Sequence, residues 1–229
     1  AIAITLGLSV AGYLWIGTAL LALVFALAVS LLIFYLGRLK GMSTSTLILS
    51  GIIMNFFFQA LQQYLQYRAS PEIAQIISGW TFGNLQRSSW ISTGVSSTCW
   101  TIVLLISFCY SWKLTAFSDG TERARGLGIN TDQLRMFVFT VSSVLVASAV
   151  AFIGTVAFVG LISPHCAKLL LGEDQRFLII GSSMVGSALM LAASIISKLM
   201  SEGATLPVGI VTSIVGVPFL FFLLLRSRE

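Results

Sequence analysis

Charged residues are scarce in this chain. Only 9% of its 229 residues are Asp, Glu, Lys or Arg, whereas 57% are hydrophobic. A soluble domain of this length needs roughly 25% charged residues to cover its surface. The composition therefore excludes an ordinary soluble protein and indicates an integral membrane protein. The net charge of +5 does not indicate nucleic-acid binding, because the basic residues are scattered between apolar runs, where such charges set membrane topology.

Residues that commonly carry chemistry are also rare. His165 is the single histidine, so a His-based metal cluster cannot form. We interpret Pro164 and His165 as structural residues, with a proton relay at His165 as the alternative. Cys99, Cys109 and Cys166 lack CxxC spacing and are interpreted as packing residues. The nucleotide motifs GxxxxGK(S/T) and GxGxxG do not occur, and the apolar runs hold no nucleophile–base pair. We therefore expect no catalysis, and no metal or cofactor bound by this chain.

Long uncharged runs occupy most of the sequence, at 1–37, 41–67, 88–112, 136–167, 177–197 and 203–225. A helix needs roughly 20 apolar residues to cross a ~30 Å hydrocarbon core, so each run can hold at least one crossing. Ala1 lies inside an apolar run without a charged segment before it, which indicates the interior of a longer chain rather than a signal peptide. We interpret residues 1–12 as the remnant of one helix and about 15–37 as the next.

The run at 136–167 decides the predicted topology. Its 32 residues are too many for one simple helix and too few for two full crossings. With one crossing, the 13 Lys and Arg residues divide seven against six between the two sides. With a full helix to about Ala157 and a short returning helix through FVGLISPHCAKLL, they divide ten against three. The positive-inside rule favours the second arrangement.

The predicted fold is therefore an all-α, polytopic transmembrane helical bundle with seven complete crossings and a remnant of an eighth. Short helices interrupted by Gly or Pro are tolerated only where protein or a water-filled cavity surrounds them. This favours a transporter or channel over a simple anchor. The segment between Arg68 and Arg87 is too short and too polar to cross, and is predicted to be an external or interfacial helix.

The densest charge cluster lies in FSDGTERARGLGINTDQLR, at 117–135, where six of nineteen residues are charged. The predicted topology makes this segment cytoplasmic. We expect a short helix in it, with Ser118 or Asp119 as the N-cap and with Gly126 and Gly128 at its C-terminal end. The segment is either a solvated connector or a compact helix that docks on a partner.

A polar stripe is predicted on the helix that contains MNFFFQALQQYLQY. Its amides recur at spacings of three and four residues, at Asn55, Gln59, Gln62, Gln63 and Gln66. Amides in hydrocarbon are costly unless they meet partners or water. Hydrogen bonds between helices and the lining of an aqueous substrate path are the two interpretations. Amides without carboxylates suit a bulky polar or chelated solute better than a bare cation.

Several segments together resemble one family. FSDGTERARGLGI is similar to the LGE-x-A-x-x-LG signature of the permeases of bacterial ABC importers of the FecCD type, which carry iron-siderophores, haem or cobalamin. GTVAFVGLISPHCAKLLLGEDQR resembles G-x-I-x-FVGLI-x-PH-x-x-R-x-x-x-G-x-D-H-R of that family. LPVGIVTSIVGVPFLFFLLLR, STSTLILSGIIMN and ISGWTFGNL also fit its motifs, in the same order.

The resemblance implies ten helices per full permease subunit, two permease subunits, two cytoplasmic ATPase subunits that hold ATP and Mg²⁺, and an extracytoplasmic substrate-binding protein. It also implies that the chain, as a permease domain over 1–229, lacks the first two helices and most of the third. The cytoplasmic coupling helices would lie within 115–130. The residues assigned to ATPase coupling are Asp119, Gly120, Thr121, Glu122, Arg123, Ala124, Arg125 and Gly128.

Three positions depart from the family pattern. Thr121 stands where the family has Glu, so Asp119 or Glu122 would replace that acid. Lys168 stands in place of an Arg and keeps the charge without the bidentate fork, and Gln175 stands in place of a His.

The prediction is a multi-pass permease subunit of the bacterial plasma membrane that imports an iron chelate by alternating access, with the polar stripe on its path. A channel, an ion-coupled secondary transporter or an inactive truncated scaffold is the alternative.

Overall fold

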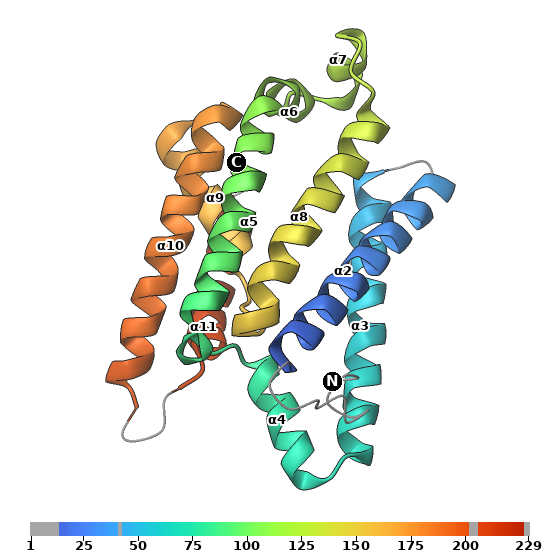
Figure 1. Ribbon diagram of the computed structural model, residues 1–229. Helices are drawn as coiled ribbons and strands as arrows, with labels where there is room; N and C mark the ends of the chain where they lie inside the picture. The colour runs from blue at the N-terminus through green and yellow to red at the C-terminus, as the bar shows by residue number, and fades with distance from the viewer. Residues whose placement is uncertain (1–13, 41–42, 202–205, 227–229) are drawn as a thin grey trace. The chain divides into compact units, whose positions relative to one another are not determined.

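The computed structural model describes residues 14–40, 43–201 and 206–226, and the regular structure in these ranges is helical (Figure 1). The all-α prediction is confirmed there. Residues 1–12, interpreted as a helix remnant, lie outside the described residues. In chain order the helices are α2 (Leu14–Leu39), α3 (Thr44–Arg68), α4 (Pro71–Thr81), η1 (Leu85–Arg87), α5 (Trp90–Cys109), α6 (Ser111–Ser118), α7 (Thr121–Gly126), α8 (Thr131–Ile153), α9 (Val159–Leu171), α10 (Gln175–Leu199) and α11 (Val208–Arg226).

Four helices are long and apolar enough to cross a membrane, namely α3 from Ser45, α5, α8 and α10. Shorter apolar helical segments lie within α2, α9 and α11, at Val24–Leu39, Val159–Leu171 and Val208–Leu223. Each of these segments overlaps one of the uncharged runs where crossings are predicted. The number of seven complete crossings stays a prediction, because three of the segments are shorter than an ordinary crossing.

The run at 136–167 divides into two helices, as predicted from its length and from the positions of the basic residues. The first helix, α8, ends at Ile153, and the short α9 begins at Val159. The predicted end near Ala157 is wrong by one helical turn. Gly154, with a φ of 88°, stops α8 earlier, because this backbone conformation cannot continue a right-handed helix.

The described residues form two compact units. The first lies within 1–78, 89–100 and 128–152, and the second lies within 79–88, 101–127 and 153–229. In the first unit α2 packs against α3, and the hydroxyls of Ser30 and Ser143 are hydrogen-bonded to each other. In the second unit α9 and α10 make the most extensive contact, and α10 also packs against α6 and α11.

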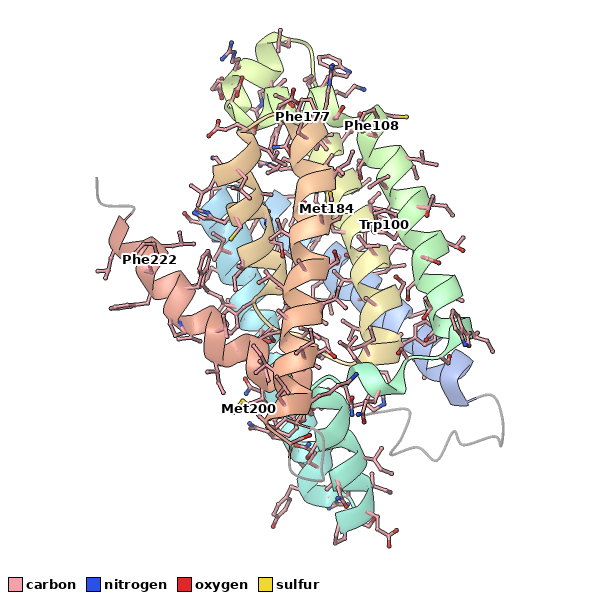
Figure 2. The ribbon with its side chains drawn as sticks, turned by 90° about the vertical axis from the view of Figure 1, so that its left-hand side faces the viewer. Trp100, Phe108, Phe177, Met184, Met200 and Phe222 are labelled. Carbon is pink, nitrogen blue, oxygen red and sulfur yellow. The ribbon has the colours of Figure 1, made fainter. Side chains whose placement is uncertain are left out.

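Small residues, chiefly Ala, Ser and Thr, make up most of the buried positions among the described residues of both units. Ala151 and Ala167 are almost completely buried, and a Cβ atom at Gly181 of α10 would lie 2.2 Å from Cδ1 of Leu171. Large apolar residues point outward instead, as Phe177 and Met184 do along α10 (Figure 2), where they are 61% and 66% exposed. Small interior residues let helix backbones approach closely when the solvent is as apolar as the side chains. The packing is therefore that of a membrane protein.

Non-helical backbone in the second unit is held by bonds between three segments, 80–84, 153–157 and 206–209. The bonds are Asn84 N to Ile153 O (2.8 Å), Gly209 N to Phe82 O (3.1 Å), Thr155 N to Trp80 O (3.4 Å) and Thr155 Oγ1 to Thr81 O. Each segment thus supplies partners for backbone groups that have no helical partner. We call these three segments the backbone junction.

Glycines allow the close approach at the backbone junction. A Cβ atom on Gly209 would lie 2.2 Å from Phe82 O, and one on Gly83 would lie 2.3 Å from Thr155 O. Gly83 also has a φ of 64°, in the left-handed region. Because the facing atoms are backbone atoms, they cannot move aside as a flexible side chain would.

Gly209→Ala is expected to lower the free energy of unfolding by about 1–3 kcal/mol, since the added methyl group forces the backbone junction apart. Gly51→Ala in α3 is the matched control, because a Cβ atom there meets nothing within 4 Å. Thermal unfolding in detergent measures the difference. Equal unfolding midpoints for the two variants would contradict the role of the junction.

Candidate functional site

The charged segment between α5 and α8 folds into two short helices, α6 and α7, which pack against each other within the second unit. Asp119 N and Gly120 N donate to Thr115 O and Phe117 O, both at 3.2 Å, and these bonds end α6. Gly120 then turns the chain with a φ of 129°. A residue with a Cβ atom rarely adopts this conformation, so the position favours glycine.

The expected short helix is present as α7, but its predicted N-cap is wrong. Ser118 Oγ donates to Thr115 O at 2.7 Å within α6, and Asp119 is the C-cap of α6. Gly120 is the N-cap of α7 and supplies no side-chain bond. At the other end Leu127 is the C-cap, and Gly128 follows with a φ of 77°. The expected role of Gly128 at the C-terminal end of the helix is confirmed.

The charges of α7 form exposed ion pairs. Arg123 Nη1 lies 3.3 Å from Asp119 Oδ2, and Arg125 Nη1 lies 3.5 Å from Glu122 Oε1. The Glu122 side chain is 92% exposed, whereas Ala124 is fully buried. The buried alanine thus packs α7 against the rest of the unit, and the charged side chains of α7 remain accessible to a partner. Exposed pairs of this kind contribute little to stability.

One hydrogen bond joins α6 to a distant part of the chain. The backbone N–H of Gln175, the first residue of α10, donates to Oγ1 of Thr115 at 3.3 Å. The two residues are 60 positions apart. Sequence reasoning missed this contact, because neither residue lies in a local pattern that points to the other.

The polar stripe lies along α3 in the first unit. Asn55, Gln59 and Gln63 are exposed in this chain, at successive spacings of four residues. Gln62 and Gln66 are half-buried, and Gln66 Nε2 donates to Ser78 Oγ of α4 at 3.3 Å. Both interpretations of the stripe therefore have a place on the helix: Gln66 bonds to another helix, whereas three amides are open to water or to another chain.

The short helix α9 holds Pro164 and His165. Pro164 lies inside the helix, where its ring removes one backbone N–H. His165 is half-buried, and its ring meets that of Phe219 in α11 edge-to-face, with centroids 6.4 Å apart. This aromatic contact supports a packing role for the single histidine.

The turn after α9 is closed by an ion pair, with Lys168 Nζ 2.7 Å from Glu173 Oε1. The hydrogen bond from Lys168, together with its positive charge, lowers the pKa of the Glu173 carboxyl. The carboxylate is therefore favoured in the folded state, and this contribution to stability is lost as the pH falls through the lowered pKa. Lys168, which replaces the Arg of the family pattern, thus has an acidic partner five residues further along the chain.

Groups of three or more His, Cys, Asp or Glu side chains that could hold a metal ion do not occur among the described residues. An apolar cavity of about 420 Å³ lies beside the backbone junction, with Phe82, Val156 and Ile210 in its lining. Its lining hydroxyls are already bonded, since Thr155 Oγ1 donates to Thr81 O and Ser213 Oγ to Gly209 O.

Comparison with known proteins finds one family over almost the whole chain. The FecCD transport family matches residues 1–226. The hemin transport system permease protein HmuU of Yersinia pestis is 31% identical over 208 residues, which are 91% of this chain and 62% of that protein. The cobalamin import system permease protein BtuC of Halobacterium salinarum is 33% identical over 81% of this chain and 49% of that protein. Other relatives are named for import of iron(3+)-hydroxamate and of Fe(3+)-citrate.

A solved structure supports the same fold. A metal-chelate type ABC transporter in an inward-facing conformation matches with a TM-score of 0.76 and 27% identity, over 88% of this chain and 72% of that chain. The curated relatives are longer, and this chain spans 49% to 64% of their length.

Asp119→Asn is expected to change the free energy of unfolding by less than about 0.5 kcal/mol, because the ion pair that it removes lies on an exposed helix. Thermal unfolding of the purified permease in detergent measures the change. A large drop in the unfolding midpoint would show that the carboxylate supports the fold and would remove the reason to assign it to a partner.

Proposed function

Because the chain belongs to the FecCD transport family, we propose that it is the permease part of a bacterial ATP-driven importer for an iron-siderophore or a related iron chelate. It works as a multi-pass protein of the plasma membrane, and a separate ATPase drives its alternating access. The observation that carries the proposal is the family match over residues 1–226, joined to a helical fold with apolar helices long enough to cross a membrane.

The iron chelate is the best-supported cargo among those of the relatives. Their names include hemin, iron(3+)-hydroxamate, Fe(3+)-citrate and cobalamin, so most of these relatives carry iron in an organic ligand. Exposed amides without carboxylates on α3 suit such a solute, because a neutral amide binds a polar chelate without holding a bare cation. A channel or an ion-coupled secondary transporter is not favoured by the family match.

The α6–α7 segment is the proposed docking site for the ATPase subunits. Glu122, Arg123 and Arg125 are exposed on α7, and each takes part in an ion pair that is weak enough to exchange for a partner's groups. The buried Ala124 and the turn at Gly120 hold the helix in a defined position. A docked ATPase would therefore displace the helix as a body rather than deform a loop.

The exposed amides of α3 are the proposed lining of the translocation path. Asn55, Gln59 and Gln63 would face the path in an assembly with a second permease subunit, and Gln62 and Gln66 would continue the same polar stripe. An extracytoplasmic binding protein would deliver the chelate. In hydrocarbon, open amides are costly, and a water-filled path between two subunits removes that cost.

Gly120→Pro is expected to lower uptake by about tenfold or more, because the coupling of two sites depends on a defined contact between them. Proline cannot adopt the φ of 129° and has no N–H for Phe117 O. The measurement is the uptake of radioactive iron bound to a hydroxamate siderophore, and hemin and cobalamin are tested in parallel. The cells express the full-length protein together with the ATPase that is encoded beside it.

The control for this experiment is Gly94→Ala in α5, where a Cβ atom meets nothing within 4 Å. The amount of each variant in the membrane is measured alongside, because a loss of insertion would lower uptake for an unrelated reason. Equal uptake by Gly120→Pro and the parent would contradict the coupling assignment. Failure of the parent to co-purify with the ATPase would contradict the proposed function itself.

Replacing Gln59 and Gln63 together by Leu is expected to lower uptake while co-purification with the ATPase remains at the parent's level. The leucines remove the hydrogen-bonding groups from the path and leave the α6–α7 segment unchanged. Gln66→Leu serves for comparison, since Gln66 bonds to Ser78 and its loss should destabilise the fold. If the double variant failed to assemble with the ATPase, a packing role for these amides would be the better explanation.

A further inference from the structure

The N-terminus of α10 is capped from two places in the chain. The first backbone N–H groups of a helix have no partner inside the helix. Asp174 Oδ1 accepts from Arg176 N at 2.9 Å, as an ordinary N-cap does. Gln175 N donates instead to Oγ1 of Thr115 in α6, at 3.3 Å. Thr115 thus acts as a cap for a helix to which it does not belong.

Hydrogen bonds hold Thr115 in place within α6 through both its side chain and its carbonyl group. Its Oγ1 donates to Ser111 O at 3.0 Å, which leaves the oxygen lone pairs free to accept from Gln175 N. Its carbonyl accepts from Ser118 Oγ at 2.7 Å and from Asp119 N at 3.2 Å, where α6 ends and turns toward α7. A displacement of α7 therefore reaches Thr115 through bonds as well as through the chain.

The other side of this contact is a rigid corner formed by α9 and α10. Gly172, with a φ of 83°, donates its N–H to Lys168 O at 3.0 Å, and the Lys168–Glu173 ion pair closes the turn. The two helices also pack closely after this turn, because a Cβ atom at Gly181 of α10 would lie 2.2 Å from Leu171 Cδ1 of α9. The first turn of α10 consequently moves together with α9.

We propose that Thr115 is a positioning residue that joins the α6–α7 segment to the α9–α10 corner through Gln175, and that this bond transmits the displacement of the segment to both helices. The inference rests on the proposed function for the source of that displacement. Through this bond α9 and α10 move together with the α6–α7 segment, although the chain connects that segment only to α5 and α8.

The test compares Thr115→Val, Thr115→Ser and Thr140→Val in the full-length protein. Valine keeps the branched shape of threonine but loses the oxygen, and serine restores the oxygen. Thr140→Val is the matched control, because Thr140 Oγ1 makes the same type of bond to its own helix, at 2.9 Å to Met136 O, and takes no part in the hydrogen bonds that cap α10. The three variants therefore separate the bond to Gln175 from the bond within a helix.

Hydrogen exchange of the purified permease, in the absence of the ATPase, tests the hydrogen bond between Gln175 N and Thr115 Oγ1. In Thr115→Val, the peptide that contains the first turn of α10 is expected to exchange about twofold to tenfold faster, because Gln175 N loses its acceptor. Thr115→Ser and Thr140→Val are expected to match the parent in that peptide. Unchanged exchange in Thr115→Val would overturn the inference at its first step.

Transport in proteoliposomes, with the ATPase bound, tests whether this bond transmits the displacement of the α6–α7 segment. Thr115→Val is expected to lower the number of chelate molecules moved per ATP hydrolysed by about threefold or more. Thr115→Ser is expected to restore this ratio. A ratio equal to the parent's, together with faster exchange, would reduce Thr115 to a helix cap and overturn the transmission role. If even the parent neither bound the ATPase nor transported the iron–hydroxamate, hemin or cobalamin probe, the proposed function would fail, whatever the exchange data show.

Discussion

Backbone groups in a hydrocarbon solvent have to find their partners within the protein, and this constraint governs the whole chain. Helices satisfy it internally, and small residues such as Ala167 and Gly181 then let two helices approach closely. Where a helix stops, as α8 does before Gly154, other segments have to supply the partners. The backbone junction does so with bonds such as Asn84 N to Ile153 O, which allows a short helix such as α9 to follow.

The same constraint separates groups that support the fold from groups that are available for function. Gln66 bonds to Ser78, and His165 packs against Phe219, so both have partners within the chain. Asn55 and Glu122 are exposed, although they lie on well-formed helices. Exposed polar groups that the fold does not require are where transport partners and cargo are best sought. The proposed path and the proposed docking site both consist of such groups.

Hydropathy and charge predicted the helices better than their ends. The division of 136–167 into a full and a short helix followed from the length of the run and the positions of basic residues, and α8 and α9 confirm it. The N-cap of α7 was predicted wrongly, because Ser118 and Asp119 are suitable caps by residue type but are bonded within and beside α6. The charged segment itself was found from composition, whereas its coupling role remains a proposal.

The sequence by itself determined that the chain is a helical membrane protein, where most of its helices lie and which family it belongs to. These properties depend on composition and on patterns within about 20 residues, the length of one crossing. Only the tertiary structure decided that Thr115 caps α10, that Gln66 meets Ser78 and that Gly83 lies against Thr155. Such contacts join residues whose local sequences carry no sign of each other, because they arise only when packed helices bring distant backbone groups within hydrogen-bonding distance.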